Sequence, residues 1–121
     1  MSADSTQPVA RVNPADVPIR PTPIDPSSIL DGTPHSGWSS IAGPPGIDIG
    51  VWEHSVGVSS DIEEDEAFVV ASGSATVVLD GGRSYDFGPG DIGVLRAGAR
   101  TTWIVHETFR KVFVTLAVDD D

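Results

Sequence analysis

Apolar residues after about position 37 occur in short runs, separated by turns rich in glycine and aspartate. Apolar and polar residues alternate in several runs, which is typical of strands with one buried face. No segment keeps a helical period, so the pattern predicts an all-β sandwich or small barrel. Strands are predicted at 47–56, 66–79, 84–87, 92–95, 100–105 and 109–118, with a bulge at Gly73 and turns at 80–83, 88–91, 96–99 and near His106-Glu107.

Residues 1–36 follow another pattern and hold seven of the ten prolines. Proline removes a backbone donor and fixes φ, which disfavours long helices and central strands. Scattered apolar residues such as Val17 and Ile19 would gain nothing from full solvation. We therefore expect a partly disordered Pro-rich arm over 1–36, whose later part lies on a surface that can belong to a partner subunit. The globular domain is expected over 37–118, followed by an acidic tail at 119–121.

Length and charge narrow the classes of function. A chain of 121 residues suits one core. The net charge of −11, with only seven Lys and Arg residues, argues against binding to nucleic acid or to an anionic membrane surface. No apolar run is long enough to span a membrane, and no secretory signal is evident. Cysteine is absent. Together these features predict a cytoplasmic protein.

The segment from Glu66 to Gly73, followed by the turn Gly88-Pro-Gly-Asp91, resembles the cupin superfamily. The resemblance implies a single jelly-roll β-barrel. A first cupin motif carries two histidines, a glutamate and then a glycine seven residues on; Glu66 and Gly73 match the last two positions. A second motif runs from a Gly-Asp turn to a histidine, whose position Thr101 occupies here.

Two further segments extend the likeness to one branch of small cupins, those grouped with the (S)-ureidoglycine aminohydrolase cupin domain. They are Gly50-Val-Trp-Glu53 and the string from Thr102 to Val112, which contains Trp103, His106-Glu107 and Arg110-Lys111. The resemblance covers roughly residues 40–117. It implies a small nitrogenous substrate, and it implies a homodimer because small cupins commonly pair through their sheets.

The ligand positions of a cupin metal centre are mostly unfilled in this sequence. Counting back from Glu66, the two histidine positions fall on Ser60 and Ile62, or on Ser59 and Asp61, and neither pair supplies an imidazole. Thr101 lacks one as well. We therefore expect no cofactor and no metal centre of the usual kind.

Glu66 has two interpretations. Pointing into the barrel beside Phe68, it would act as an acid or base or anchor a polar ligand; at the barrel mouth it would be a solvated carboxylate paired with an arginine. The acids from Glu63 to Asp65 are interpreted as a solvated turn. Trp103 shares its face with Thr101, so it is expected to line the barrel, either as core or as a stacking wall.

His106 is interpreted as a turn residue or as a titrating group, and which face of 47–56 points inward stays open. Two functions follow. The first is binding of a small molecule by Glu66, Phe68, Thr101 and Trp103, with Glu53 or His54 added from the strand at 47–56. The second is hydrolysis of a small nitrogenous metabolite with Glu66 or His106 as acid or base.

Overall fold

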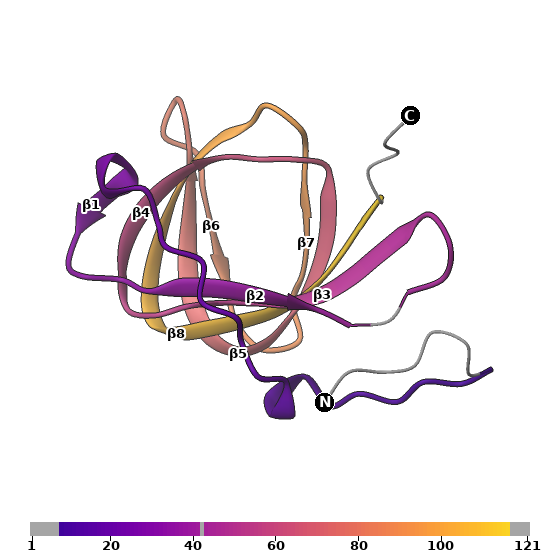
Figure 1. Ribbon diagram of the computed structural model, residues 1–121. Coiled ribbons are helices and arrows are strands. Elements are labelled where there is room, and N and C mark those ends of the chain that lie inside the picture. Colours follow the sequence, from indigo (N-terminus) through magenta and orange to yellow (C-terminus); the bar gives the residue numbers. More distant parts are fainter. Residues whose placement is uncertain (1–7, 42, 117–121) are drawn as a thin grey trace.

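The computed structural model describes residues 8–41 and 43–116, and it confirms an all-β jelly-roll architecture (Figure 1). Two short 3-10 turns, Pro14–Asp16 and Pro26–Ser28, precede the first strand. In the described residues, no helix is long and apolar enough to cross a membrane. The strands are β1 (Ile29–Asp31), β2 (Ser36–Ser40), β3 (Ile47–His54), β4 (Gly57–Ile62), β5 (Glu66–Leu79), β6 (Ser84–Phe87), β7 (Ile92–Leu95) and β8 (Arg100–Leu116).

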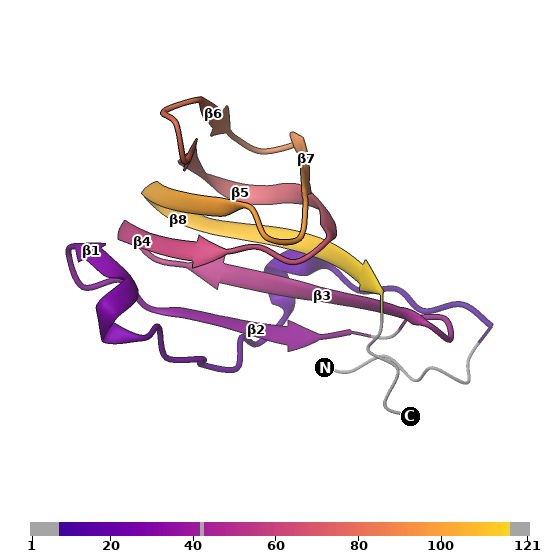
Figure 2. The ribbon, with the colours of Figure 1, turned by 90° about the horizontal axis from the view of Figure 1, so that it is seen from above.

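Two long strands, β5 and β8, form the centre of the sheet and pair with each other along most of their length. The other edge of β8 pairs first with β4 and then with β3, while the other edge of β5 pairs with β7 and then with β6. β2 extends the sheet beyond β3, and β1 extends it beyond β4. Seen from above in Figure 2, β6 and β7 lie at one margin and β2 at the other.

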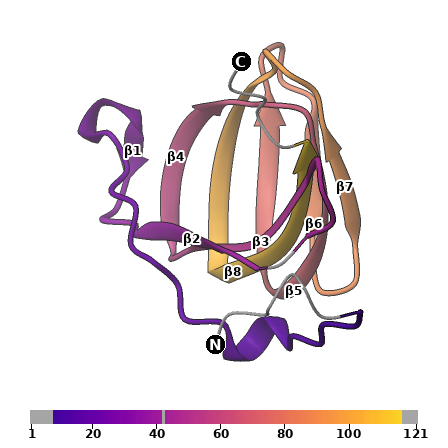
Figure 3. The same ribbon diagram turned by 45° about the vertical axis from the view of Figure 1, so that its right-hand side comes forward.

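The sheet curls because its long strands bend at the same level, giving the barrel-like outline in Figure 3. The register between β5 and β8 shifts three times between Val70 and Ala75, around the predicted bulge at Gly73. Gly73 has φ of +83°, and a Cβ added there would collide with the carbonyl oxygen of Thr108. Only glycine satisfies both conditions, so this residue allows the two central strands to bend together.

The concave face of the curled sheet holds the hydrophobic core. Alternate residues of β5 and β8 point inward, among them Phe68, Val70, Trp103 and Phe109, and all four are buried. Their aromatic rings pack edge to face or tilted, with centroids of Phe68–Trp103 and Trp103–Phe109 at 6.2 and 5.7 Å. This packing fixes which side of each strand can reach the interior.

Two sequence predictions about the strands were wrong. A turn was predicted at His106-Glu107, but β8 continues through it from Arg100 to Leu116, because the bulge in β5 absorbs the bend. No strand was predicted between residues 56 and 66, but Gly57–Ile62 forms β4 and pairs with β8. Its inward residues are polar, which hides the usual alternation.

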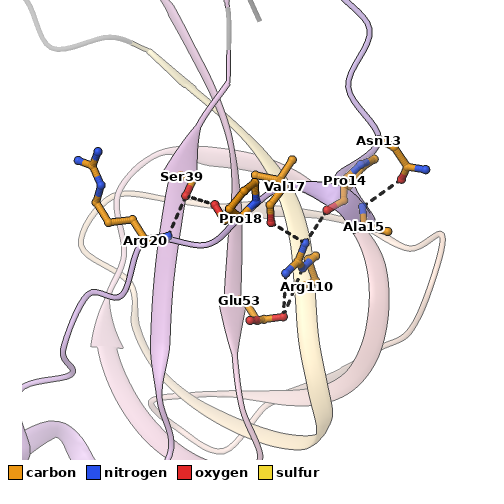
Figure 4. A network of polar contacts seen from close by, with 9 residues as sticks. All are labelled: Asn13, Pro14, Ala15, Val17, Pro18, Arg20, Ser39, Glu53 and Arg110. Carbon is orange, nitrogen blue, oxygen red and sulfur yellow. Dashed lines mark hydrogen bonds and ion pairs between the residues drawn. The ribbon is translucent and has the colours of Figure 1, made fainter. Parts of the chain in front are cut away.

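The described part of the Pro-rich arm packs on the domain of the same chain. Some of its residues form hydrogen bonds with the sheet. The backbone N–H groups of Thr22 and Trp38 donate to the carbonyls of Ser36 and Arg20, so residues 20–22 line the free edge of β2. Figure 4 shows how Arg110 of β8 holds the preceding segment: its guanidinium donates to the carbonyl oxygens of Pro14 and Val17 at 2.6 and 3.1 Å. The arm thereby covers a sheet edge within the same chain.

Candidate binding cavity

A cavity of about 750 Å³ opens at one end of the concave face. Strands β2, β3, β4, β5 and β8 and the segment between β4 and β5 contribute its walls. Four aromatic side chains and six carboxylates line it together with a single lysine. The lining includes Trp38, Asp48, Trp52, Asp61, Glu63, Glu66, Trp103, Lys111 and Phe113.

Lys111 and Glu66 form an ion pair in the wall of the cavity. The ammonium nitrogen of Lys111 lies 2.6 Å from Oε2 of Glu66, and the two side chains are 6% and 17% exposed. The same nitrogen lies 4.7, 4.6 and 4.9 Å from the ring centroids of Trp52, Phe68 and Trp103. Three aromatic faces and one carboxylate therefore surround the ammonium, which compensates its loss of water.

Glu63 closes the cavity wall next to this pair. Its side chain is buried, and Oε2 accepts hydrogen bonds from the Thr101 hydroxyl at 2.6 Å and from the Trp103 indole N–H at 2.9 Å. The backbone of Glu63 is also fixed, because its N–H donates to Ala99 and its carbonyl accepts from Gly98. The prediction that Glu63 belongs to a solvated turn was wrong, since this carboxylate satisfies two buried donors.

Asp61 lies at the rim of the cavity, two residues before Glu63 in the sequence. Oδ1 accepts a hydrogen bond from the backbone N–H of Ile62 at 2.8 Å. Partial loss of water around Asp61 raises the pKa of its carboxyl, and the negative charge of Glu63 raises this pKa further. Asp61 is thus an exposed carboxylate that forms no ion pair with a Lys or Arg among the described residues.

The inward face of β3 is settled by the structure: Trp52 and His54 point into the barrel, while Val51 and Glu53 point outward. His54 is fully buried, and its Nδ1 lies 2.6 Å from the Ser55 carbonyl oxygen, which makes Nδ1 the protonated nitrogen. Nε2 then accepts a hydrogen bond from the Ser59 hydroxyl at 2.8 Å. Burial lowers the pKa of His54, so the imidazole is held neutral.

The structure brings some of the predicted site residues together and separates others. Glu66 and Trp103 line the cavity. Phe68, Thr101 and His54 are buried in the adjoining core, where Phe68 underlies the Lys111 ammonium and Thr101 serves Glu63.

The other two predicted residues lie away from the cavity. Glu53 is on the outer face, where its carboxylate pairs with Arg110 at 3.1 Å (Figure 4). His106 is exposed, and its Nε2 contacts the Thr76 hydroxyl at 2.9 Å. Glu66 and His106 are therefore not brought into one site.

Sequence reasoning missed Lys111 and the wall formed by Trp38 and Trp52. A signal for Lys111 was present, because it lies between Phe109 and Phe113 at the spacing of residues that share one face of a strand. For Trp38 the signal was weaker, since β2 is short and its neighbours are glycine and serine. Trp38 pairs directly with Trp52 across the two strands.

Comparisons with known proteins agree with this architecture. The EutQ protein of Clostridium difficile is 18% identical, with a TM-score of 0.71, over 93% of this chain and 90% of that one. A DUF861 family protein of Thermotoga maritima is 26% identical over 55% of this chain and 76% of its own length, with a TM-score of 0.52. A cupin superfamily protein of Desulfitobacterium hafniense is 18% identical over 69% and 78%, with a TM-score of 0.54.

The first and third of these likenesses show the fold alone, given their low identity. No functionally curated protein matches the chain. The comparisons give no support to the narrower resemblance to the ureidoglycine aminohydrolase branch. The family model for the EutQ-like cupin domain matches residues 46–113, more than half of the sequence, and the chain therefore belongs to the EutQ-like cupin family.

Proposed function

We propose that this domain binds a small molecule in the cavity between β3, β5 and β8, and that it does so without a metal ion of the usual cupin kind. The observation that carries the proposal is the open cavity of about 750 Å³, whose wall contains a preformed Lys111–Glu66 pair among aromatic rings. Small-molecule sites combine such apolar walls with a few placed polar groups.

The residues at the metal-ligand positions fit other tasks. Ser59 and Asp61 are the pair that faces inward, since Ser59 reaches His54 in the core and Asp61 lines the cavity. Glu66 is neutralised by an ammonium, and the Thr101 hydroxyl is engaged with Glu63. Within residues 8–41 and 43–116, no three His, Cys, Asp or Glu side chains are arranged to hold an ion. We infer that the Lys111 ammonium supplies the positive charge that a metal would bring.

The alternative, hydrolysis of a small nitrogenous metabolite, has less support from the geometry. It requires a group that takes up a proton near the substrate. Glu66 already accepts a hydrogen bond from Lys111, and His106 lies outside the cavity lining. Turnover of a ureide panel by the wild-type protein, abolished in Glu66→Gln, would nevertheless establish the enzyme and overturn a role in binding alone.

The binding proposal is tested by NMR of the three tryptophan indole N–H groups during titration with pools of small metabolites. We expect at least one compound to shift the Trp52 and Trp38 signals in a saturable manner. Thr115→Trp, which adds bulk to the cavity lining, should abolish the shift, whereas Ser84→Trp on exposed β6 should retain it. Hits that shift only signals outside the cavity, or that survive Thr115→Trp, would overturn the proposal.

We also propose that the domain forms a homodimer through the outer face of β7, β5 and β8. Two rows of apolar residues cross this face, and the pairing register defines them: Val94, Ala67, Val114 and Ile49 in one, and Ile92, Val69 and Val112 in the other. Ile92, Val94 and Val114 are 75%, 60% and 40% exposed.

The occupant we infer is a second copy of the chain. Neither row contains a charged residue, although the chain carries a net charge of −11, so this face is where two copies can approach with least repulsion. Sedimentation equilibrium should show a dimer for the wild type and a monomer for Val94→Glu. A wild-type monomer, or a dimer that Val94→Glu does not weaken, would overturn the proposed dimer.

A further inference from the structure

The charge of the cavity lining specifies a class of ligand. Six carboxylates line the cavity against one ammonium, and Lys111 is already paired with Glu66. An anionic ligand would therefore enter a cavity of like charge, within a protein whose own net charge is −11. This arrangement disfavours carboxylates and phosphates and favours a ligand that carries positive charge.

The carboxylates differ in how much of their charge is already used. Glu63 accepts two buried hydrogen bonds, and Glu66 is held by Lys111. Asp61 accepts one hydrogen bond, from a neighbouring backbone N–H, and the charged groups that act on it are Glu63, Lys111 and Glu66. Among the described residues, no Lys or Arg forms an ion pair with Asp61, so no direct partner neutralises its negative charge.

The aromatic walls supply the second half of the recognition. Lys111 demonstrates within this molecule how the cavity accommodates an ammonium, at 4.6 to 4.9 Å from three ring centroids. Trp38 adds a ring that no cation occupies in the described structure: it is 44% exposed, lines the cavity and packs edge-on against Phe113 at 6.2 Å. Aromatic faces beside a carboxylate are the arrangement that binds alkylated ammonium ions.

We propose that the cavity selects a small organic cation, an amine or quaternary ammonium, with the cationic head between Trp38, Trp52 and Asp61. The inference rests on the proposed function, because it concerns the ligand of the same cavity. An organic cation is attracted both by the aromatic rings and by the Asp61 carboxylate, whereas a neutral molecule of equal size is attracted only by the rings.

The test compares three probes of similar shape: tetramethylammonium, tert-butanol and pivalate, titrated separately at low salt while the indole signals are followed by NMR. We expect tetramethylammonium to bind at least about tenfold more tightly than tert-butanol, with pivalate weakest. Asp61→Asn should weaken tetramethylammonium binding by about tenfold and leave tert-butanol unchanged. Asp80→Asn, which removes the same charge on the hairpin turn away from the cavity lining, should have little effect.

The outcomes separate the two proposals. Binding of tert-butanol or pivalate in the cavity at least as tightly as tetramethylammonium would overturn the ligand class and leave small-molecule binding intact. Equal loss of tetramethylammonium binding in Asp61→Asn and Asp80→Asn would also overturn it, since net charge alone would then explain the preference. If neither the three probes nor the metabolite pools shift the indole signals of the cavity tryptophans, the proposed function is overturned as well.

Discussion

Replacing Lys111 by methionine removes the ammonium and keeps an unbranched side chain of similar length. The carboxylate of Glu66, 17% exposed and 2.6 Å from the lost nitrogen, would then remain in the cavity wall without its partner. Breaking a buried ion pair from one side typically costs about 3–5 kcal/mol of unfolding free energy. Because Glu66 keeps some contact with water, we expect the lower end, about 3 kcal/mol.

A double-mutant cycle separates this ion pair from the general effect of changing a buried lysine. Glu66→Gln added to Lys111→Met removes the uncompensated charge, so the double variant should regain much of the loss, with a coupling energy of about 2 kcal/mol. Urea denaturation followed by tryptophan fluorescence measures all four unfolding free energies. Arg83→Met, at an exposed position on the hairpin turn, is the matched control and should change stability by less than about 0.5 kcal/mol.

Two results would refute the reasoning. One is an unfolding free energy of Lys111→Met within about 0.5 kcal/mol of the wild-type value, which would mean that the pair is solvated like a surface ion pair. The other is strict additivity in the cycle, which would mean that Lys111 and Glu66 contribute independently.

Three further substitutions test other parts of the structure. Glu63→Ala leaves two buried donors without an acceptor and should cost about 2–3 kcal/mol in urea denaturation, whereas Glu64→Ala, at an exposed position, should cost little. Asp61→Asn should raise the free energy of unfolding at neutral pH, because it removes a charge that the native state disfavours. The gain should vanish as the pH falls through the raised pKa of Asp61, since the native carboxyl is then protonated. Equal gains at pH 7 and at acid pH would contradict this expectation. Gly73→Ala should cost several kcal/mol by thermal unfolding, while Gly81→Ala, with positive φ but open space, should cost about 1 kcal/mol.

Most strands could be predicted from the sequence because turns mark their ends. The bounds of β5, β6 and β7 agree with the predicted ranges, since Asp80-Gly81-Gly82 and Gly88-Pro89-Gly90 interrupt the alternating runs. β4 escaped prediction because its inward residues, Ser59 and Asp61, face His54 and the cavity rather than an apolar core. Polar residues at inward positions erase the periodicity on which strand prediction depends.

The site was predicted only in part, for a physical reason. Glu66 and Trp103 were identified because a family resemblance fixes their direction. Lys111 was not, because a lysine in a strand is expected at the surface unless its partner is known. That partner, Glu66, lies 45 residues earlier in the chain, and only the pairing of β5 with β8 brings the two together.

We propose that the Lys111 ammonium takes the place of the metal in this cavity. The most direct measurement is the transition-metal content of the protein purified without chelators, determined by mass spectrometry of the elements. We expect a content well below one equivalent per chain, with the same value in wild type and in Glu66→Gln. One tightly bound equivalent in the wild type that Glu66→Gln loses would contradict it.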